Sequence, residues 1–305
     1  MDNTKYSIIV PTCNRKELLL ELIKTINLED ESLNELIIVD SSDKNYNIEI
    51  INENKKINYI FTDTRSASIQ RNTGIKHLSN NSQYVFFLDD DVKPDKDYFR
   101  LLLETIKQSG AIGASGIALE YNFTNNKHSN FLINSFKRIF LLDSKIGGSL
   151  LKSAVNIPIQ GRFKKNNNLY NSNWLIGCSI WDVNIFSKIQ FPKNFFGQSL
   201  GEDVLFSAKA RDYGKLVVNS KIILWHEMAN KERPNKKEHY IMWVRNRFII
   251  SRELNLSKFN VLFHWANLGA LIGLVLNLPK KKADSLKSII GIFLGYKALW
   301  RINDN

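Results

Sequence analysis

The sequence has few cysteines: only Cys13 and Cys178 occur among 305 residues. Two cysteines exclude a disulfide framework and a cysteine-rich zinc cluster, and they suit a reducing cytosol. Neither has a matching base motif, so we interpret both as packing residues. The N-terminus MDNTKYSIIV lacks a basic stretch followed by a long apolar core, so we expect no signal peptide. No repeat with a period of about 20–50 residues is visible, which argues against a solenoid.

Hydrophobic residues make up 44% of the chain, which is enough for a sizeable core and excludes global disorder. Lys and Arg number 42 against 30 Asp and Glu, for a net charge of +12. A basic balance suits nucleic acid, an anionic membrane surface or an anionic small molecule, and charge alone does not choose among them.

Short β-branched stretches alternate with helical patterns over the first 110 residues. We expect strands at 6–15, 35–43, 57–63 and 83–91, and helices at 16–27, 66–78 and 95–110. This alternation predicts an α/β unit with a mostly parallel central sheet flanked by helices. Polar clusters at 11–14, 40–43 and 89–91 follow three of the strands, so we expect them to meet at one edge of the sheet.

The pattern is weaker between residues 111 and 200. The stretch 122–173 is rich in Asn, Lys and Ser and predicts loops with partial strands. A strand-like run at 173–186 leads into a turn or short helix. We expect a helix over 201–214, closed by Gly214, and then a strand over 215–227.

The stretch YVFFLDDDVKPD (84–95) places four apolar residues directly before three carboxylates, Asp89, Asp90 and Asp91. Two carboxylates at i and i+2 of a strand end repel by about 2–3 kcal/mol at an effective dielectric constant near 20. This cost predicts a nearby positive charge. Asp89 and Asp91 point to the same side, whereas Asp90 points away, so we expect Asp90→Asn to be mild.

The order of motifs along the chain resembles the inverting glycosyltransferases of family 2. The motifs are PTCNR, IIVDSSD, a helix with RNTG, FFLDDDV, GED and WH, over about residues 5–230. The later YIMWVRNRFII (240–250) resembles bacterial rhamnosyltransferase-like members of that family. The resemblance implies a GT-A fold, with a Rossmann-like sheet, and transfer of a sugar from a UDP- or dTDP-sugar with Mn²⁺ or Mg²⁺ as cofactor.

The resemblance also implies roles for particular residues. Asp203 would be the general base, with Glu202 beside it in the catalytic pair, where it would bind the acceptor or orient the loop. Nucleotide-sugar binding would involve Pro11, Thr12, Arg15, Asp40, Arg71, Asn72, Asp89 and Asp90. The metal would be held by Asp91, Asp89 and His226, and the acceptor by Trp174, Gly177 and Trp181.

Structural interpretations remain open for these residues. The acid run also fits a helix N-terminus, and Asp40 fits an Asx turn. Arg71 could form a structural ion pair or reach the diphosphate. The acids after Gly201 suit the dipole of a helix start, His226 could be structural, and the tryptophans could be core residues. DDDV also fits a haloacid-dehalogenase-like phosphatase, but three strands precede it and no G-D-x-x-x-D follows.

The last seventy residues have a different character. The run 259–278 is long enough to cross a membrane but contains three polar residues, His264, Asn267 and Asn277. In 285–301, apolar residues including Ile289, Ile292 and Phe293 share one helical face, and lysines lie off it. This pattern favours an interfacial helix, with core packing or a membrane span as alternatives.

We therefore expect a GT-A domain at 1–235, with a nucleotide-binding half at 1–115 and an acceptor-binding half at 116–235. Residues 236–305 would form a helical membrane-associating region with amphipathic and apolar helices. The expected function is a metal-dependent glycosyltransferase, cytoplasmic and peripheral on the inner face of the cell membrane. It would extend a lipid-linked glycan, carried on a polyprenyl diphosphate, in bacterial surface polysaccharide assembly. A catalytically silent nucleotide-binding scaffold is the alternative, and we expect no nucleic-acid partner, since no binding module is recognisable.

Overall fold

A computed structural model describes residues 4–46, 54–120, 131–160, 162, 168–195, 200–226, 235–279 and 281–303. The chain divides into two compact units, each described by itself below. The sheet unit comprises residues 1–123 and 163–228, and the helical unit comprises residues 124–162 and 229–305. This division differs from the expected domains, because residues 124–162 group with the C-terminal helices rather than with an acceptor-binding half.

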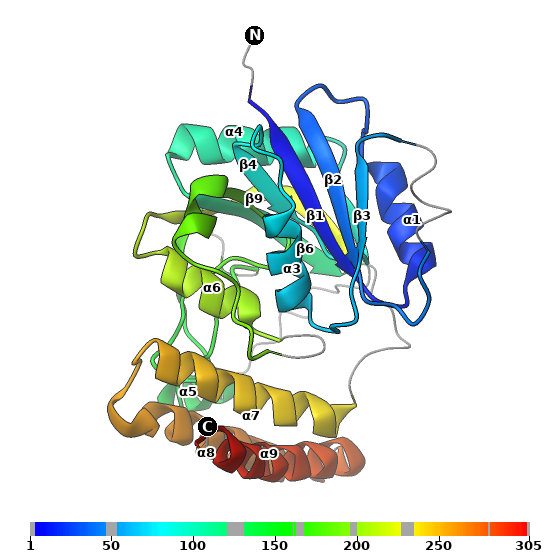
Figure 1. Ribbon diagram of the computed structural model, residues 1–305. Helices are drawn as coiled ribbons and strands as arrows, with labels where there is room; N and C mark the ends of the chain where they lie inside the picture. Colours follow the sequence, from blue (N-terminus) through cyan, green and yellow to red (C-terminus); the bar gives the residue numbers. More distant parts are fainter. Residues whose placement is uncertain are drawn as a thin grey trace. The chain divides into compact units, whose positions relative to one another are not determined.

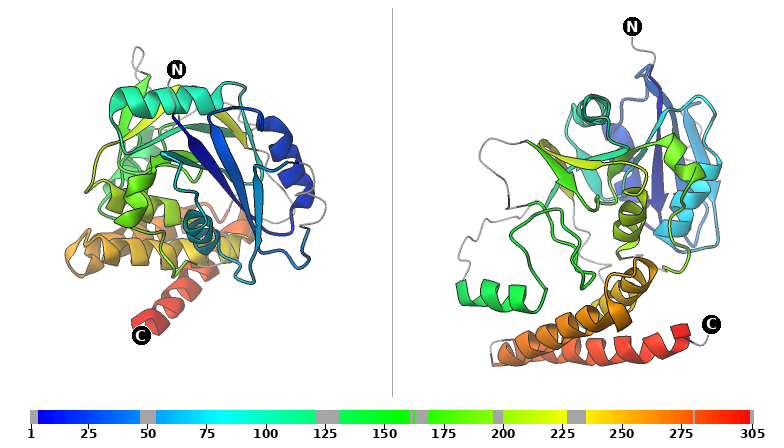
Figure 2. Two further views of the ribbon diagram at one scale, coloured as in Figure 1. Left: turned by 45° about the horizontal axis from the view of Figure 1, so that its top comes forward. Right: turned by 90° about the vertical axis from the view of Figure 1, so that its left-hand side faces the viewer.

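In the described part of the sheet unit, nine strands form one mixed sheet (Figures 1 and 2). They are β1 (Tyr6–Thr12), β2 (Leu33–Asp40), β3 (Ile57–Phe61), β4 (Tyr84–Phe87), β5 (Val92–Pro94), β6 (Gly113–Glu120), β7 (Leu169–Ser172), β8 (Ser179–Asp182) and β9 (Leu216–His226). The order is β3-β2-β1-β4-β8-β6-β9-β5, with β7 also paired to β9. The strands β3, β2, β1 and β4 are parallel, as the alternation with helices predicted.

Helices cover both faces of the sheet. They are α1 (Lys16–Thr25), α3 (Ala67–Lys76), α4 (Tyr98–Ser109) and α6 (Glu202–Ala210), with a 3₁₀ turn η1 (Val183–Ser187). Leu22 of α1 and Leu102 of α4 share a core with Ile8 of β1, whereas Gly74 of α3 lies against Ile9 on the opposite face. Strand alternation therefore separates α1 and α4 from α3.

Several helix ends lie close to their predicted positions, and one does not. Ser66 caps α3 by accepting a hydrogen bond from the Ile69 N–H, and Gly110 closes α4 with φ 60°. The helix expected to run to Gly214 ends at Ala210. Gly214 instead packs against Ile112, where an added Cβ would lie 2.5 Å from the Ile112 Cγ2.

The helical unit contains α5 (Phe131–Ile139), α7 (Lys236–Glu253), η2 (Lys258–Asn260), α8 (Val261–Leu276) and α9 (Lys282–Asn303). The side chains of Val244 and Phe248 from α7, Phe263 from α8, and Ile292 and Leu299 from α9 form its core. The stretch 122–173 was expected to be loops with partial strands, and its described part contains the short strand β7 but also the helix α5, which was not expected. Among the described residues, Lys258–Leu276 is long and apolar enough to cross a membrane, and 22% of it is buried.

Helix α9 packs against α7 through small residues. An added Cβ on Gly291 would lie 2.5 Å from the Lys237 carbonyl oxygen, and one on Gly295 would lie 2.7 Å from the Val244 Cβ. The spacing G-x-x-x-G therefore permits close backbone approach, as it does between helices in general. The expected single apolar face of this helix is wrong in one respect, because Ile292 is fully buried whereas the adjacent Phe293 is 61% exposed.

Gly291→Ala separates helix propensity from packing. Propensity alone favours alanine by about 1 kcal/mol, but the contact with the Lys237 carbonyl predicts net destabilisation of about 1–3 kcal/mol. Gly273→Ala is the matched control, because its Cβ would meet only Phe136 at 3.7 Å. Urea unfolding followed by circular dichroism should show that Gly291→Ala lowers the free energy of unfolding and Gly273→Ala raises it. Stabilisation by both substitutions would contradict the close packing at Gly291.

Candidate active site

The carboxyl ends of the parallel strands bring the predicted polar clusters together. In the parallel pair β1–β4, Ile9 lies opposite Phe87, so Thr12 lies near Asp90 three residues further along each strand. The Thr12 hydroxyl donates to the Asp90 carboxylate at 2.7 Å. The antiparallel pair β5–β9 places Val92 opposite His226. The sheet register alone therefore assembles residues that are 214 positions apart, from Thr12 to His226.

Asp90 and Asp91 share one counter-charge, Arg15. Its guanidinium donates to Asp90 Oδ1 at 2.9 Å and to Asp91 Oδ2 at 3.1 Å. On its other side, Asp91 Oδ1 lies 3.3 Å from His226 Nε2. Arg15 and His226 are partly exposed, whereas both carboxylates are buried. The positive charge that the acid run required is thus supplied partly by the protein itself.

Burial raises the pKa of Asp90 to about 6, although Arg15 and Thr12 oppose the shift. Burial, followed by the neighbouring Asp89, also raises the pKa of Asp91, while His226 and Arg15 oppose it. The charged forms of both groups depend on their partners, because burial alone disfavours them. Asp90 does not point away from the site as expected, because its side chain accepts hydrogen bonds from the Thr12 hydroxyl of β1 and the Arg15 guanidinium.

A second cluster is centred on Arg71 of α3. This side chain is 2% exposed, donates to Asp89 Oδ1 at 2.7 Å, and also pairs with Glu202. Gly177 lies against it, because an added Cβ there would be 2.8 Å from the Arg71 Nη2. Arg71 thus connects the first acid of the D-D-D run to the first acid of α6.

The Arg71 cluster contains more acid than base. Burial raises the pKa of Glu202 to about 8 and that of Asp203 to about 6, and Arg71 opposes both shifts. One guanidinium cannot neutralise Asp89, Glu202 and Asp203 together, so a proton is retained more easily there than in water. Arg71 itself stays charged, because the surrounding carboxylates raise its pKa. Asp203 is partly exposed, whereas Glu202 is buried.

Other predicted site residues are buried in supporting roles. Asp40 is fully buried, accepts hydrogen bonds from the Ser42 N–H and hydroxyl and from the Tyr59 hydroxyl, and so forms an Asx turn. Asn72 holds the chain at Phe191 through two hydrogen bonds of 2.9 Å. Pro11 is buried within β1. All three are buried in this structure, with Asp40 0% and Asn72 6% exposed.

The two predicted acceptor tryptophans differ. Trp181 is 1% exposed and packs edge-on against Phe206 at 4.8 Å, so it is a core residue rather than an acceptor platform. Trp174 is half-buried, and its indole N–H has no hydrogen-bond partner among the described residues. This N–H is a buried donor, although part of the Trp174 residue is exposed.

The predicted three-ligand metal site is not assembled. Among the described residues, no group of three His, Cys, Asp or Glu side chains is arranged to hold a metal ion. Asp91 and His226 are adjacent, but Arg71 binds Asp89. The donor set still fits a divalent cation in part, because a carboxylate and an imidazole lie 3.3 Å apart and Asp89 is 38% exposed.

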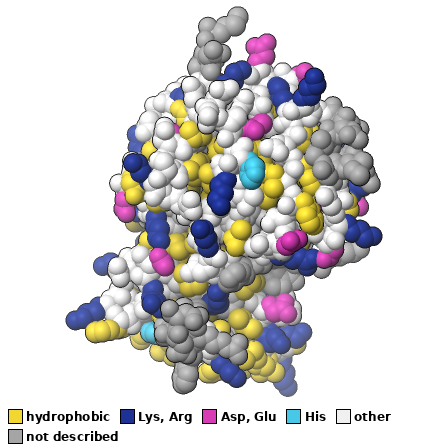
Figure 3. Space-filling view, in the orientation of Figure 1, with side chains coloured by type: hydrophobic (Ala, Val, Ile, Leu, Met, Phe, Trp, Pro, Cys, Tyr) yellow, Lys and Arg dark blue, Asp and Glu magenta, His cyan; other side chains and the backbone are white. Residues whose placement is uncertain are grey.

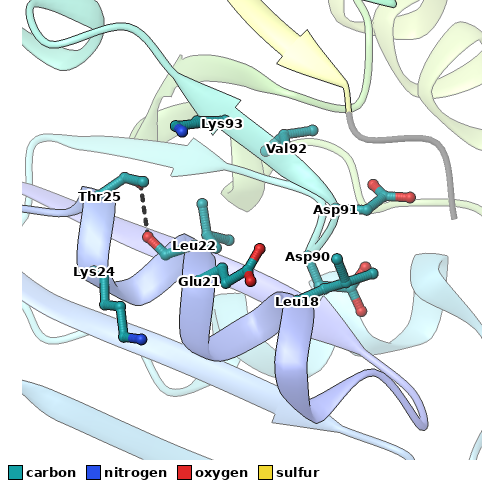
Figure 4. A pocket seen from close by; sticks show the side chains of 9 residues that line it. All are labelled: Leu18, Glu21, Leu22, Lys24, Thr25, Asp90, Asp91, Val92 and Lys93. Carbon is teal, nitrogen blue, oxygen red and sulfur yellow. Dashed lines mark hydrogen bonds between the residues drawn. The ribbon is translucent and has the colours of Figure 1, made fainter. Parts of the chain in front are cut away.

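A cleft of about 350 Å³ lies between α1 and β5, beside the acids (Figure 4). Figure 4 shows Glu21, Asp90 and Asp91 along one side, with Lys24 and Lys93 pointing away from them. The sequence motifs did not indicate Glu21, because it lies within a helix and belongs to none of the quoted motifs. It is the one carboxylate of α1 that lines this cleft.

The order and direction of the strands, with the polar cluster at their carboxyl ends, define an α/β fold of the GT-A class. Residues 7–170 match the family model of glycosyl transferase family 2, which is more than half of the chain. The chain belongs to this family.

The comparisons with individual proteins are more distant. An uncharacterised glycosyltransferase of Rickettsia conorii is 28% identical over 115 residues, and one of Rickettsia felis is 27% identical over 115 residues. Each match covers 37% of this chain and 19% of the relative, so this chain matches about a fifth of their length. Neither is named for rhamnosyl transfer.

Solved structures support the GT-A fold. The structure of Staphylococcus aureus TarS residues 1–349 aligns with a TM-score of 0.55 at 15% identity, covering 96% of this chain and 81% of that one. GalNAc-T7, solved with UDP, GalNAc and Mn²⁺, aligns with a TM-score of 0.59 at 13% identity, covering 88% and 55%. At these identities the similarity is one of fold.

Asp90→Asn tests the buried pair with Arg15. The substitution removes the charge but keeps an acceptor for Thr12, so we expect a loss of about 1–3 kcal/mol in the free energy of unfolding. Asp97→Asn is the control, because this carboxylate is 57% exposed and should change stability by less than about 0.5 kcal/mol. Equal urea midpoints for the two variants would restore the view that Asp90 is expendable.

Proposed function

We propose that this protein is an inverting glycosyltransferase that moves a sugar from a UDP- or dTDP-sugar to a hydroxyl of a lipid-linked glycan. The observation that carries the proposal is the half-buried Asp203, held beside the Arg71–Asp89–Glu202 cluster at the sheet edge. Membership of glycosyl transferase family 2 supports the reaction class. TarS has been solved with UDP-GlcNAc, which supports a uridine nucleotide as donor.

In the proposed reaction, Asp203 accepts the proton of the acceptor hydroxyl. The acceptor oxygen attacks the anomeric carbon from the face opposite the diphosphate, and the carbon–oxygen bond to the nucleoside diphosphate breaks with inversion. Arg71 keeps Asp203 ionised by opposing the effect of burial on its pKa. Glu202 is a positioning residue, because it is buried against Arg71 and out of reach of an acceptor.

A divalent cation, Mn²⁺ or Mg²⁺, is part of the proposal. Asp91 and His226 would hold it, and when bound it would neutralise the charge that develops on the leaving diphosphate. Arg15 contributes a fixed positive charge on the other side of Asp91. Trp174 and Gly177 are both partly exposed, and we propose that an acceptor sugar contacts them.

We further propose that the enzyme acts in bacterial surface polysaccharide assembly, peripheral on the inner face of the cell membrane. A lipid-linked acceptor, such as a glycan on a polyprenyl diphosphate, would require this location. The basic charge of the chain supports an anionic membrane surface as partner.

Release of UDP or dTDP from a panel of nucleotide sugars, with and without Mn²⁺, tests the reaction. We expect cation-dependent transfer to a lipid-linked acceptor and a loss of about 100-fold or more in Asp203→Ala, as expected for removal of a general base. Asp91→Ala should lose the cation-dependent transfer. Asp212→Ala, an acid just beyond α6, is the control and should retain transfer. Tight UDP binding without turnover by the unmodified protein would favour the silent scaffold instead.

The pH dependence of transfer follows from Asp203. Because its pKa is raised to about 6, the base is protonated below that pH, and kcat/KM should fall tenfold per pH unit on the acidic side. Unfolding does not explain such a fall, because a carboxyl with a raised pKa binds its proton more tightly in the folded state and so stabilises the fold as pH decreases. A profile that is flat between pH 5 and 7 (about one unit on either side of 6) would rule out Asp203 as the base.

A further inference from the structure

Apolar side chains are exposed along the outer faces of two helices in the helical unit. On α9 these are Leu286, Ile290, Phe293 and Leu294, which are 50%, 42%, 61% and 38% exposed. On α8 they are Val261, Trp265, Leu268, Val275 and Leu276, which are 58%, 40%, 47%, 51% and 68% exposed. We call these two sets the outer stripes.

Each outer stripe faces away from the core of its own unit. The buried residues of α9 recur at 285, 288, 291, 292, 295 and 299, on the side that packs against α7. The stripe at 286, 290, 293 and 294 lies on the opposite side of the same helix, because successive residues turn by about 100°. Helix α8 likewise buries Phe263 and Ala266 and exposes Val261, Trp265 and Leu268. Both helices are therefore apolar on two sides while only one side is packed.

The charge of the protein is concentrated in the same unit. Residues 124–162 and 229–305 contain 20 Lys and Arg against 6 Asp and Glu, whereas the sheet unit contains 22 against 24. The whole excess of positive charge thus lies in the helical unit. Lys287 and Lys297 are exposed on α9 near its outer stripe, and Lys258 lies just before α8. Figure 3 shows hydrophobic side chains next to Lys and Arg along the lower part of the view, where the C-terminal helices lie.

We infer that the outer stripes of α8 and α9 insert into the interfacial region of an anionic lipid bilayer, with the flanking lysines on the lipid headgroups. Exposed apolar stripes in a strongly basic unit complement both layers of such a surface, the acyl chains and the anionic headgroups. A second copy of this chain fits less well, because two units that each carry a large excess of positive charge would repel.

The stripes lie on the bilayer surface and do not cross it. The inner side of α8 is committed to protein contacts, with Gly269 against Phe140 and Phe263 in the shared core. Asn267 of α8 accepts from the buried Arg247 guanidinium at 2.9 Å, and Arg247 also donates to the Ser153 carbonyl. A spanning helix would have to expose this polar pair to lipid, which is costly.

This surface would bring the enzyme to a lipid-linked acceptor, and only this purpose rests on the proposed function. Binding to vesicles is measured without any sugar transfer. Vesicle binding by a protein without transferase activity would leave the surface intact and remove the proposed reaction. Transfer to a soluble acceptor without vesicle binding would leave the proposed reaction intact and remove the surface.

The experiment is co-sedimentation of the full chain with vesicles of phosphatidylcholine alone or with about one-third phosphatidylglycerol. We expect binding to the anionic vesicles and a loss of about tenfold or more in Ile290→Glu/Phe293→Glu, since burial of both side chains is removed. Leu169→Glu/Tyr213→Glu is the matched control, because it places the same charges on exposed apolar positions of the sheet unit. Lys287→Glu/Lys297→Glu should weaken binding to anionic vesicles only.

Trp265 gives a second measurement that needs no charged substitution. Its ring is 40% exposed on α8, so brominated lipids should quench its fluorescence, and Trp265→Phe should remove most of that quenching. Sedimentation equilibrium of the unmodified protein tests whether a second copy of this chain covers the outer stripes instead. Equal vesicle binding by the helical-unit and control variants, absence of quenching at Trp265, or a dimer that only Ile290→Glu/Phe293→Glu dissociates would each overturn the inference.

Discussion

The buried guanidinium of Arg71 is the interaction on which the site depends. It pairs with Asp89 at the start of the acid run and with Glu202 at the start of α6, two segments more than one hundred residues apart in sequence. Removing one partner of a buried ion pair commonly costs about 3–5 kcal/mol, because an uncompensated charge remains. The absence of a side chain at Gly177 makes room for this guanidinium. The segment that follows β4 and the start of α6 are therefore both held to α3 by a single cation.

Three carboxylates gather around the one guanidinium of Arg71. Burial, with Asp89 adding to it, raises the pKa of Asp203 to about 6, so this group binds a proton more tightly than a solvated aspartate. The second cluster repeats the pattern, since Asp90 and Asp91 share Arg15. Arg15, Asp89, His226 and Asp203 are partly exposed, whereas Thr12, Asp90 and Glu202 are buried.

Much of the sheet could be predicted, because its strands are β-branched runs that end in polar turns. The helices α3 and α4 also lie close to their predicted positions, because Ser66 marks the start of α3 and Gly110 marks the end of α4. The middle of the chain was harder. Residues 131–139 form a helix within a stretch rich in Asn, Lys and Ser, and α5 has no buried residue of its own to mark its face. The sequence also could not tell the two tryptophans apart, although Trp181 is a core residue and Trp174 is half-buried.

The sequence by itself determined the family, the sheet edge at which the acids gather and the residue types available there, because ordered motifs and strand ends are local features. It did not determine which of the acids are buried against partners and which are exposed. Whether Asp90 points to solvent or to Thr12 and Arg15 depends on the register of β1 with β4, and whether Asp40 is open depends on Ser42 and Tyr59. Only the tertiary structure decided these points, since the energy of a buried carboxylate is set by partners that lie far away in the sequence.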